Sequence, residues 1–399
     1  IFMKDNAAPT KKLFPNLLSI RFWMSCAVIY CHIEETKYIR HLFTSFDSVL
    51  RFHTVGFYPM LMFFTLSGFL ITYQLETEKI NTQTISLPKF YKNRALRILP
   101  LYYLSIIIYW VVIPNSIFAN YFDTIFFHSG FGDVEMYSFS KNLLFVLCLF
   151  LLPQIPYVLT SINNRSWVYG AHHWSVGVEE LFYIFWPMLW RRMKNFKRFI
   201  IKCFIAFYVV FIGSILFVAL VNKFYPTHKL LKFVSLVNVQ LVYFSSATCF
   251  FIGAIGIYLY IHHIDFVHKY VTKTTALICF SLIIFITAIG FERPIFVNEF
   301  ICACFIVVVL YLMKDGKKIL FFDHPFIVYL GKITYAVYLV HWFVLVIVMY
   351  YLEKFHIQEK GELLFNVLQY SLTFIFTYGI AAILYEQYEK RFLALRNKM

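Results

Sequence analysis

The sequence predicts an all-α, multi-pass integral membrane helix bundle, and three observations lead to that fold class. Of the 399 residues, 60% are hydrophobic and only 14% are charged, whereas soluble domains are about 45–50% apolar and about 25% charged. The mean hydropathy of +0.68 agrees with this excess. The apolar residues also gather in repeated runs of roughly the length that a ~30 Å hydrocarbon core requires. One membrane domain without a large soluble module is therefore expected.

About ten transmembrane helices are expected, because ten apolar runs approach the about 20 residues that a spanning helix needs. These runs lie near 15–33, 55–75, 97–114, 174–190, 198–221, 237–261, 273–290, 294–313, 327–350 and 364–386. An eleventh run, near 141–159, is shorter and is interrupted by Pro153 and Pro156. We expect that run to form a re-entrant or interfacial helix rather than a crossing.

The basic residues predict how the bundle is oriented. If only the ten long runs cross, the strongest basic clusters all fall on one side, and cytoplasmic loops of membrane proteins collect Lys and Arg. The clusters are Lys11/Lys12, Lys79 to Arg97, Arg191 to Arg198, Lys269/Lys273, Lys314 to Lys318 and Lys390 to Lys398. The sequence therefore predicts a protein of the inner (plasma) membrane with both termini in the cytoplasm and 141–159 on the outer side. The net charge of +15 has the same origin, so no nucleic-acid partner is expected.

The chain is expected to contain a single membrane domain at 13–392, flanked by cytoplasmic tails at 1–12 and 393–399. Ile1 and Phe2 precede Met3 and are expected to be a cloning remnant. The eight cysteines are scattered, mostly in apolar runs, and no CxxC pair occurs. Neither a disulfide framework nor a metal site is expected from them.

An arginine and a histidine share the first apolar run. Arg21 and His32 are eleven positions apart, which in an α-helix is three turns plus about 20°, so both lie on one side, roughly 16 Å apart. An ionisable group inside a bilayer costs roughly 2.5–3.5 kcal/mol on insertion scales and therefore indicates function. The alternatives are an arginine that reaches the inner headgroups and a histidine at the outer interface.

Two further arginines, Arg94 and Arg97, stand at i and i+3 at the cytoplasmic mouth of the third run. Guanidinium groups at this spacing suit phosphate oxygens. The alternative is a positively charged flank of the kind that many spanning helices carry.

Three other polar positions lie within apolar runs. Ser175 and Glu179 are four residues apart and so share a helix face. A carboxyl at that depth is protonated, paired or exposed to a wet cavity, and a buried polar network without chemistry is the alternative. His341 falls near the middle of its run, and the small residues of 62–72 indicate close helix packing. Phosphate-binding groups inside and a His, a Ser and a Glu toward the outside suit a transferase with a cytosolic donor and an external acceptor.

Five motifs, in the same order along the chain, resemble those of the acyltransferase-3 family of integral membrane acyltransferases. They are the Arg21–His32 pair (R-x10-H), the Arg94–Arg97 pair (RxxR), and residues 63–72, 172–183 and 331–342. The resemblance runs from about 13 to 392 and implies a ten-helix domain that moves an acyl group, usually acetyl from acetyl-CoA, onto a sugar hydroxyl. It also implies that His32 and the three arginines are essential. Leu18 and Ser19 depart from the family by replacing an aspartate and a glycine.

The resemblance implies several partners. The donor is acetyl-CoA or another short acyl-CoA, the acceptor is a surface glycan or glycolipid, and the chain contacts membrane lipid, with no metal. Some members carry an SGNH hydrolase-like domain, which is not expected in this chain because it stops at Met399.

The hypothesis assigns a role to each candidate. Arg94 and Arg97 hold the phosphates of acyl-CoA, Arg21 lines its path, and His32 acts as general base on the acceptor hydroxyl. Glu179, with Glu35 as second choice, orients the imidazole, and Ser175 donates to the developing oxyanion. An acylated His32 is the main variant within this class. A transporter or flippase of an exported glycan or lipid is the competing class, because the same charges could line a substrate path.

Overall fold

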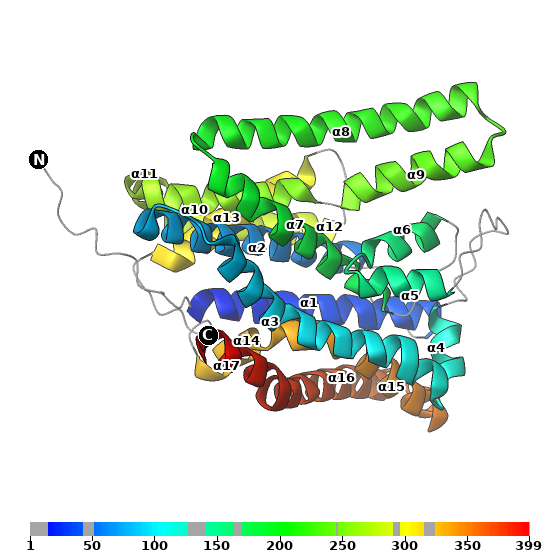
Figure 1. The fold of residues 1–399 in the computed structure, drawn as a ribbon. Helices are drawn as coiled ribbons and strands as arrows, with labels where there is room; N and C mark the ends of the chain where they lie inside the picture. Colours follow the sequence, from blue (N-terminus) through cyan, green and yellow to red (C-terminus); the bar gives the residue numbers. More distant parts are fainter. Residues whose placement is uncertain are drawn as a thin grey trace, which may run out of the picture.

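The chain folds into a bundle of α-helices in the computed structural model (Figure 1). The structure describes residues 15–42, 52–126, 141–162, 170–244, 246–289, 296–314 and 324–398. Within these ranges every regular element is a helix and no β-strand occurs, which confirms the all-α class. The predicted N-terminal tail, residues 1–12, lies outside the described residues.

The helices fall into long and short groups. The long ones are α1 (Pro15–Ile39), α2 (Phe52–Thr82), α3 (Leu87–Ile107), α7 (Trp174–Arg192), α8 (Phe196–Phe224), α9 (Lys229–Phe244), α10 (Ala247–His262), α12 (Lys273–Ile289), α13 (Val297–Met313), α15 (Thr334–Lys354) and α16 (Glu362–Leu384). The short ones are α4 (Ala119–Phe126), α5 (Lys141–Leu149), α6 (Gln154–Ile162), α11 (Ile264–Tyr270), α14 (Pro325–Lys332) and α17 (Lys390–Lys398). Single turns extend some of them: η1 (Ile108–Val112), η2 (Ile113–Asn115), η3 (Ala171–His173), η5 (Ile357–Lys360) and η6 (Tyr385–Glu389).

Each of the ten predicted runs contains a helix, and the multi-pass bundle is confirmed. Among the described residues, seven helices are long and apolar enough to cross a membrane, or up to eight if the bent pair of α11 and α12 forms one span. The other two predicted spans correspond to α7 and α13. α7 carries two glutamates and two arginines within its 19 residues, and α13 has only 17 residues.

The interrupted run near 141–159 forms two short helices, as its prolines indicate. α5 and α6 have nine residues each, so each rises only about 13 Å and cannot span a ~30 Å hydrocarbon core. The chain turns between them at Leu151, whose φ is +59°. α5 packs on α3, and α6 packs on α7 and α9.

Helix α1 lies at the centre of the bundle, where it packs against α2, α13, α14, α15 and α16. α8 lies at the outside (Figure 1), and only 11% of its most apolar window is buried. The residues of α1 are therefore the ones best placed to line an interior site.

Two glycines allow α2 and α10 to cross in close contact. A Cβ on Gly68 would overlap the carbonyl oxygen of Phe250, and a Cβ on Gly253 would overlap that of Thr65. The interpretation of residues 62–72 as a packing segment agrees with this crossing.

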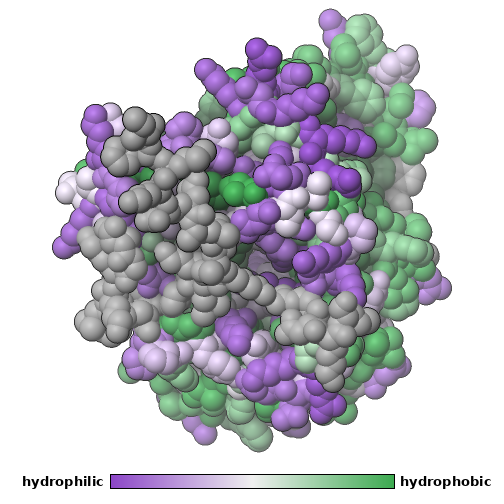
Figure 2. All heavy atoms as spheres, turned by 60° about the vertical axis from the view of Figure 1, so that its left-hand side comes forward, coloured by the Kyte–Doolittle hydropathy of each residue, from purple (hydrophilic) through white to green (hydrophobic). Residues whose placement is uncertain are grey.

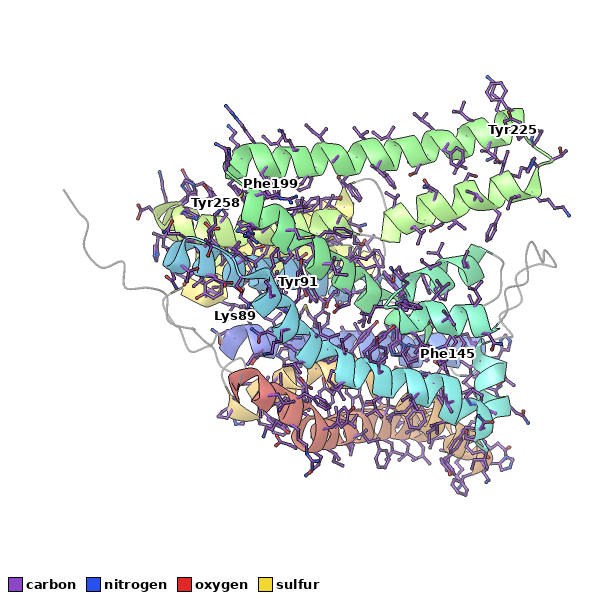
Figure 3. All side chains as sticks on the ribbon, viewed as in Figure 1. Lys89, Tyr91, Phe145, Phe199, Tyr225 and Tyr258 are labelled. Carbon is purple, nitrogen blue, oxygen red and sulfur yellow. The ribbon has the colours of Figure 1, made fainter. Side chains whose placement is uncertain are left out.

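The two ends of the bundle differ in what they carry. We call the end at which α1 begins the N-terminal end, and the opposite one the distal end. α17 and the turns after α2, α7 and α10 lie at the N-terminal end, whereas the turn between α8 and α9 lies at the distal end (Figure 1). Figure 2 brings the N-terminal end forward and shows hydrophilic side chains gathered there. Lys89 and Tyr91 lie toward this end, while Phe145 and Tyr225 lie toward the other (Figure 3).

Candidate active site

Helix α1 positions the first two candidate residues. It is unbroken over its 25 residues, so the eleven positions from Arg21 to His32 correspond to roughly 16 Å of rise along one side. Arg21 lines a cavity that opens toward the N-terminal end, whereas His32 lies beyond that cavity. The two side chains thus belong to two different parts of one interior site.

Glu35 is the carboxylate that holds His32. Its Oε2 lies 3.0 Å from Nδ1 of His32, and each of the two side chains is 17% exposed. With Nδ1–H donated to this carboxylate, Nε2 of His32 keeps its lone pair. The ring of Trp342 packs against the imidazole at a centroid distance of 4.7 Å.

Three imidazoles meet at this point, and we call His32, His172 and His341 the histidine cluster. The rings of His32 and His341 are 5.3 Å apart, and those of His341 and His172 are 5.2 Å apart. Nδ1 of His341 donates to the Tyr338 carbonyl at 2.6 Å. The buried Nε2 atoms of His172 and His341 have no hydrogen-bond partner among the described residues. The cluster therefore presents imidazole nitrogens that can accept protons.

His172 was not among the sequence candidates. The two consecutive histidines before Trp174 could have indicated a functional site. However, they lie outside the apolar run, and the sequence does not show how deeply such a residue lies in the membrane. Both ring nitrogens of the neighbouring residue, His173, already have hydrogen-bond partners. Nδ1 of His173 contacts the Gly170 carbonyl at 2.7 Å, and Nε2 contacts the Ser105 hydroxyl at 2.9 Å.

Ser175 lies next to the cluster with its hydroxyl already paired. Its Oγ is 2.7 Å from the hydroxyl of Tyr338, and Tyr338 donates in turn to the His172 carbonyl. The Ser175 proton is therefore directed at the tyrosine oxygen. The expected role of Ser175 as an oxyanion donor would require this bond to break.

Glu179 does not contact His32, which corrects its expected role as first-choice orienting carboxyl. One of its oxygens accepts from Ser67 at 2.8 Å and the other from Tyr183 at 2.8 Å. Both bonds direct the carboxylate toward α2 and its own helix. The sequence could not decide which of Glu179 and Glu35 is the partner of His32, because the positions of both glutamates on their helices are compatible with that contact.

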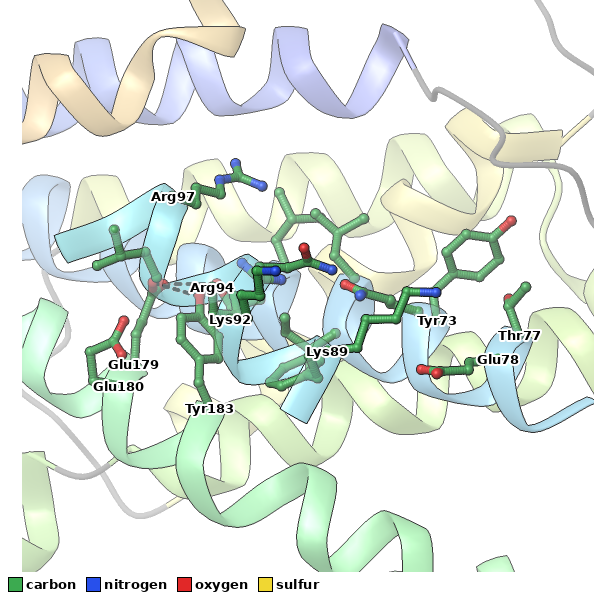
Figure 4. Close-up of a pocket in the computed structure, with 18 of the residues that line it drawn as sticks. Tyr73, Thr77, Glu78, Lys89, Lys92, Arg94, Arg97, Glu179, Glu180 and Tyr183 are labelled. Atoms are coloured by element: carbon green, nitrogen blue, oxygen red, sulfur yellow. Dashed lines mark hydrogen bonds between the residues drawn. The ribbon is translucent and has the colours of Figure 1, made fainter. Parts of the chain in front are cut away.

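The three candidate arginines converge on one cavity of about 1100 Å³, which we call the arginine-lined cavity. It is formed by α2, α3 and α7, with Arg21 from α1 and Tyr335 from α15. Figure 4 shows Lys89, Lys92 and Arg94 between the α2 residues on one side and the α7 residues on the other. The guanidinium of Arg94 lies over the Tyr183 ring, 4.7 Å from its centroid.

The charges in this cavity favour an anion. Arg21, Arg94 and Arg97 form no ion pair with a carboxylate within the part of the chain that the structure describes. The walls carry five cationic side chains and three carboxyls, the cations being Arg21, Lys89, Lys92, Arg94 and Arg97. Unpaired guanidiniums bind phosphate oxygens through charge-assisted hydrogen bonds.

Helices α7 and α15 connect the cavity to the histidine cluster. Val176 and Tyr335 line the cavity. His172 lies in the turn η3 just before α7, and Tyr338 lies one turn after Tyr335 on α15. The Ser175–Tyr338 hydrogen bond lies between the two parts.

The distal end is held together by a charged network. Arg40 pairs with Glu353 at 2.6 Å, and Tyr121 donates to the same carboxylate at 2.8 Å. The hydrogen bonds that Arg40 donates to Glu353 raise the pKa of Arg40, and burial together with this carboxylate raises the pKa of Tyr121. Among the described residues, no group of three or more His, Cys, Asp or Glu is arranged to hold a metal ion.

The chain is similar to a known protein family and to a curated protein. The profile of the acyltransferase-3 family, described as an acyltransferase domain, matches residues 16–386. A protein of Bacillus subtilis (strain 168), named "Putative peptidoglycan O-acetyltransferase YrhL", is 32% identical over 136 residues. Those residues cover 33% of this chain and 19% of that protein. No solved structure matches the chain significantly.

Proposed function

Because the chain belongs to the acyltransferase-3 family, we propose that it is a membrane-embedded O-acyltransferase that moves an acyl group from acyl-CoA to a hydroxyl of a cell-envelope glycan or glycolipid. The observation that carries this proposal is the arrangement of the site. Three arginines that form no ion pair among the described residues line a cavity at the N-terminal end, and a histidine with a carboxylate partner lies farther along α1.

The arginine-lined cavity binds the donor. Arg94 and Arg97 hold the phosphates of acyl-CoA, and Arg21 receives the part of the donor that enters the bundle. Its volume of about 1100 Å³ is slightly above the about 300–1,000 Å³ typical of ligand pockets, which suits a large nucleotide thioester. The basic turns at this end support a cytoplasmic orientation for it, and both termini then lie in the cytoplasm.

His32 acts as the general base of the transfer. Its Nε2 accepts the proton of the acceptor hydroxyl as the hydroxyl oxygen attacks the thioester carbonyl carbon. When the carbon–sulfur bond breaks, the imidazolium returns that proton to the sulfur, so that an ester and free CoA thiol are formed. Glu35 holds the ring through Nδ1 and stabilises its cationic form.

The acceptor assignment rests on the relative. That protein is named for peptidoglycan O-acetylation, which supports acetyl as the acyl group and a glycan of the cell envelope as the acceptor. Since the match spans about a fifth of that protein, the acceptor is a proposal for this chain.

Release of CoA thiol by the purified chain in lipid nanodiscs tests the proposal. With acetyl-CoA and a peptidoglycan disaccharide, we expect thiol release together with an acetylated disaccharide detected by mass spectrometry. His32→Ala should abolish both while the protein stays folded. Wild-type protein that releases no thiol with any of several glycan acceptors would contradict the proposal and favour a transporter.

The donor site is tested separately. Arg94→Ala and Arg97→Ala should raise the KM for acetyl-CoA about tenfold each, because each removes a charge-assisted hydrogen bond of about 1.5–3 kcal/mol. The matched control is Arg198→Ala, at the same end but outside the cavity lining. Unchanged KM values in both variants would contradict the docking site. Radiolabelled acetyl-CoA without acceptor distinguishes the acyl-histidine variant, which predicts label on the protein.

A further inference from the structure

Helix α16 carries four polar side chains along its buried side. Asn366, Gln369, Thr373 and Thr377 follow each other at intervals of three or four residues, so they form one stripe on the helix. Asn366 is 9% exposed, and the other three are fully buried. We call these four residues the α16 polar stripe.

The side chains of the stripe lack the hydrogen bonds that burial demands. Oδ1 of Asn366, both polar atoms of Gln369, and the hydroxyls of Thr373 and Thr377 have no partner among the described residues. A buried polar group without a partner is destabilising, and more so in a bilayer, where lipid offers no replacement. Valine or leucine would pack against the neighbouring helices without this penalty. These side-chain atoms without partners therefore indicate that the stripe holds bound molecules that both donate and accept hydrogen bonds.

Contacts between α1 and α16 fix the depth of the stripe. Tyr370 donates to Glu34, and the hydroxyl of Tyr378 lies 2.7 Å from that of Ser25. The two helices therefore run antiparallel, and His32, two residues before Glu34, lies at about the level of residue 372. The stripe thus begins near the distal end with Asn366, passes the level of His32 at Thr373, and ends at Thr377.

Polar groups on the neighbouring helices continue the stripe. Oε2 of Glu34 is buried and has no hydrogen-bond partner in the described part of the chain, although Oε1 is paired with Lys37 at 2.5 Å. Nε2 of His341, on α15, is likewise free within the described residues, and α15 packs along α16. None of the four stripe residues lines the arginine-lined cavity. The stripe and the cavity therefore approach His32 from opposite ends of the bundle.

We propose that the α16 polar stripe is a binding track for hydroxyl groups that leads from the distal end of the bundle to His32. Its ligands are O–H groups, each of which both donates and accepts hydrogen bonds and so can satisfy amide and hydroxyl side chains in succession. Ordered water and the hydroxyls of the acceptor glycan are the two sources of this chemistry. The link to catalysis rests on the proposed function, but the occupancy of the track does not.

Hydroxyl-radical footprinting by X-ray radiolysis of the full chain in nanodiscs tests occupancy without requiring activity. Radicals formed from bound water label adjacent side chains, so Tyr378, next to Thr377, should be labelled at least fivefold faster than Phe376 on the exposed side of α16. Thr377→Val should reduce labelling of Tyr378 severalfold, whereas Ser371→Ala should not, because that hydroxyl bonds within the helix. Equal labelling of Tyr378 and Phe376 would overturn the proposal.

Thermal stability gives a second, independent readout. Valine has nearly the shape of threonine, so Thr373→Val and Thr377→Val remove a hydroxyl without opening a cavity. If the hydroxyls are bound to water or to another O–H group, the midpoint of thermal unfolding stays level or falls. A rise in the midpoint for both variants would mean that the hydroxyls have no partner, and this would contradict the proposed binding track.

Transfer kinetics distinguish the two sources. With the peptidoglycan disaccharide of N-acetylglucosamine and N-acetylmuramic acid as probe, Thr373→Val should raise the acceptor KM about fivefold and leave the KM for acetyl-CoA unchanged if the track binds acceptor hydroxyls. An unchanged acceptor KM, with labelling lost, assigns the track to water and supports occupancy. Absence of acyl transfer by the wild type would contradict the proposed function. The footprinting and thermal-stability measurements would still show whether the α16 polar stripe is occupied.

Discussion

Replacing Glu35 with glutamine should slow acyl transfer about tenfold without weakening donor binding. Glu35 accepts from Nδ1 of His32 at 3.0 Å, and with 17% exposure each, the pair is poorly screened by water. Glutamine keeps an acceptor oxygen but loses the charge. Hydrogen bonds to charged groups contribute about 1.5–3 kcal/mol and neutral ones about 0.5–1.5 kcal/mol. The midpoints of these two ranges differ by about 1.3 kcal/mol, which corresponds to roughly a tenfold change in rate.

The assay is the rate of CoA thiol release at saturating acetyl-CoA and acceptor, with protein in nanodiscs. We expect a lower kcat and an unchanged KM for acetyl-CoA, because Glu35 does not line the arginine-lined cavity. Glu179→Gln is the matched control, since Glu179 is bonded to Ser67 and Tyr183 instead of His32. That variant should keep its kcat. If Glu179→Gln lowered kcat and Glu35→Gln did not, Glu179 would be the positioning carboxylate, and the reasoning from this structure would be refuted.

Three further predictions concern other parts of the fold. His341→Phe keeps the ring volume but removes the free Nε2, so kcat should fall at least tenfold; an unchanged kcat would leave only a packing role. Gly253→Val would push α2 from α10 and should lower stability by about 1–3 kcal/mol, measured as the thermal midpoint in detergent, and an unaltered midpoint would contradict the close crossing. Arg40→Ala removes the cationic partner of Glu353 at the distal end and should lower stability by up to about 1 kcal/mol, an effect that should shrink at high salt; equal midpoints for variant and wild type at low salt would contradict it.

The fold class and the approximate helix positions could be predicted because they depend on local sequence. A long apolar run in a bilayer has little alternative to a helix, since every backbone group must be satisfied within the segment. Close helix packing at Gly68 was also predictable, because a residue this small allows two helices to approach closely. The number of spans was harder to predict, because α7 and α13 are borderline in length or charge and their burial depends on their neighbours.

The candidate site was predictable only in part. The spacing of Arg21 and His32 determines that they share one side of a helix, and Arg94 and Arg97 are neighbours for the same reason. The partner of His32 was not predictable, because Glu35 and Glu179 are both within reach of plausible helix arrangements. His172 and the α16 polar stripe went unrecognised, because a threonine or glutamine in an apolar run has no visible consequence until its surroundings are known.

By itself, the sequence determined that this protein is a helical membrane bundle, that Arg21 and His32 lie one above the other, and that the chain carries the motifs of an acyltransferase family. The first two properties follow from composition and from the geometry of a single helix, and the third from the resemblance to known sequences. The tertiary structure was needed to show that three arginines face one cavity, that Glu35 holds His32, and that α16 presents polar groups without partners among the described residues at the level of that histidine. Such facts depend on how separate helices are rotated and placed against one another, and that is set by packing across the whole bundle.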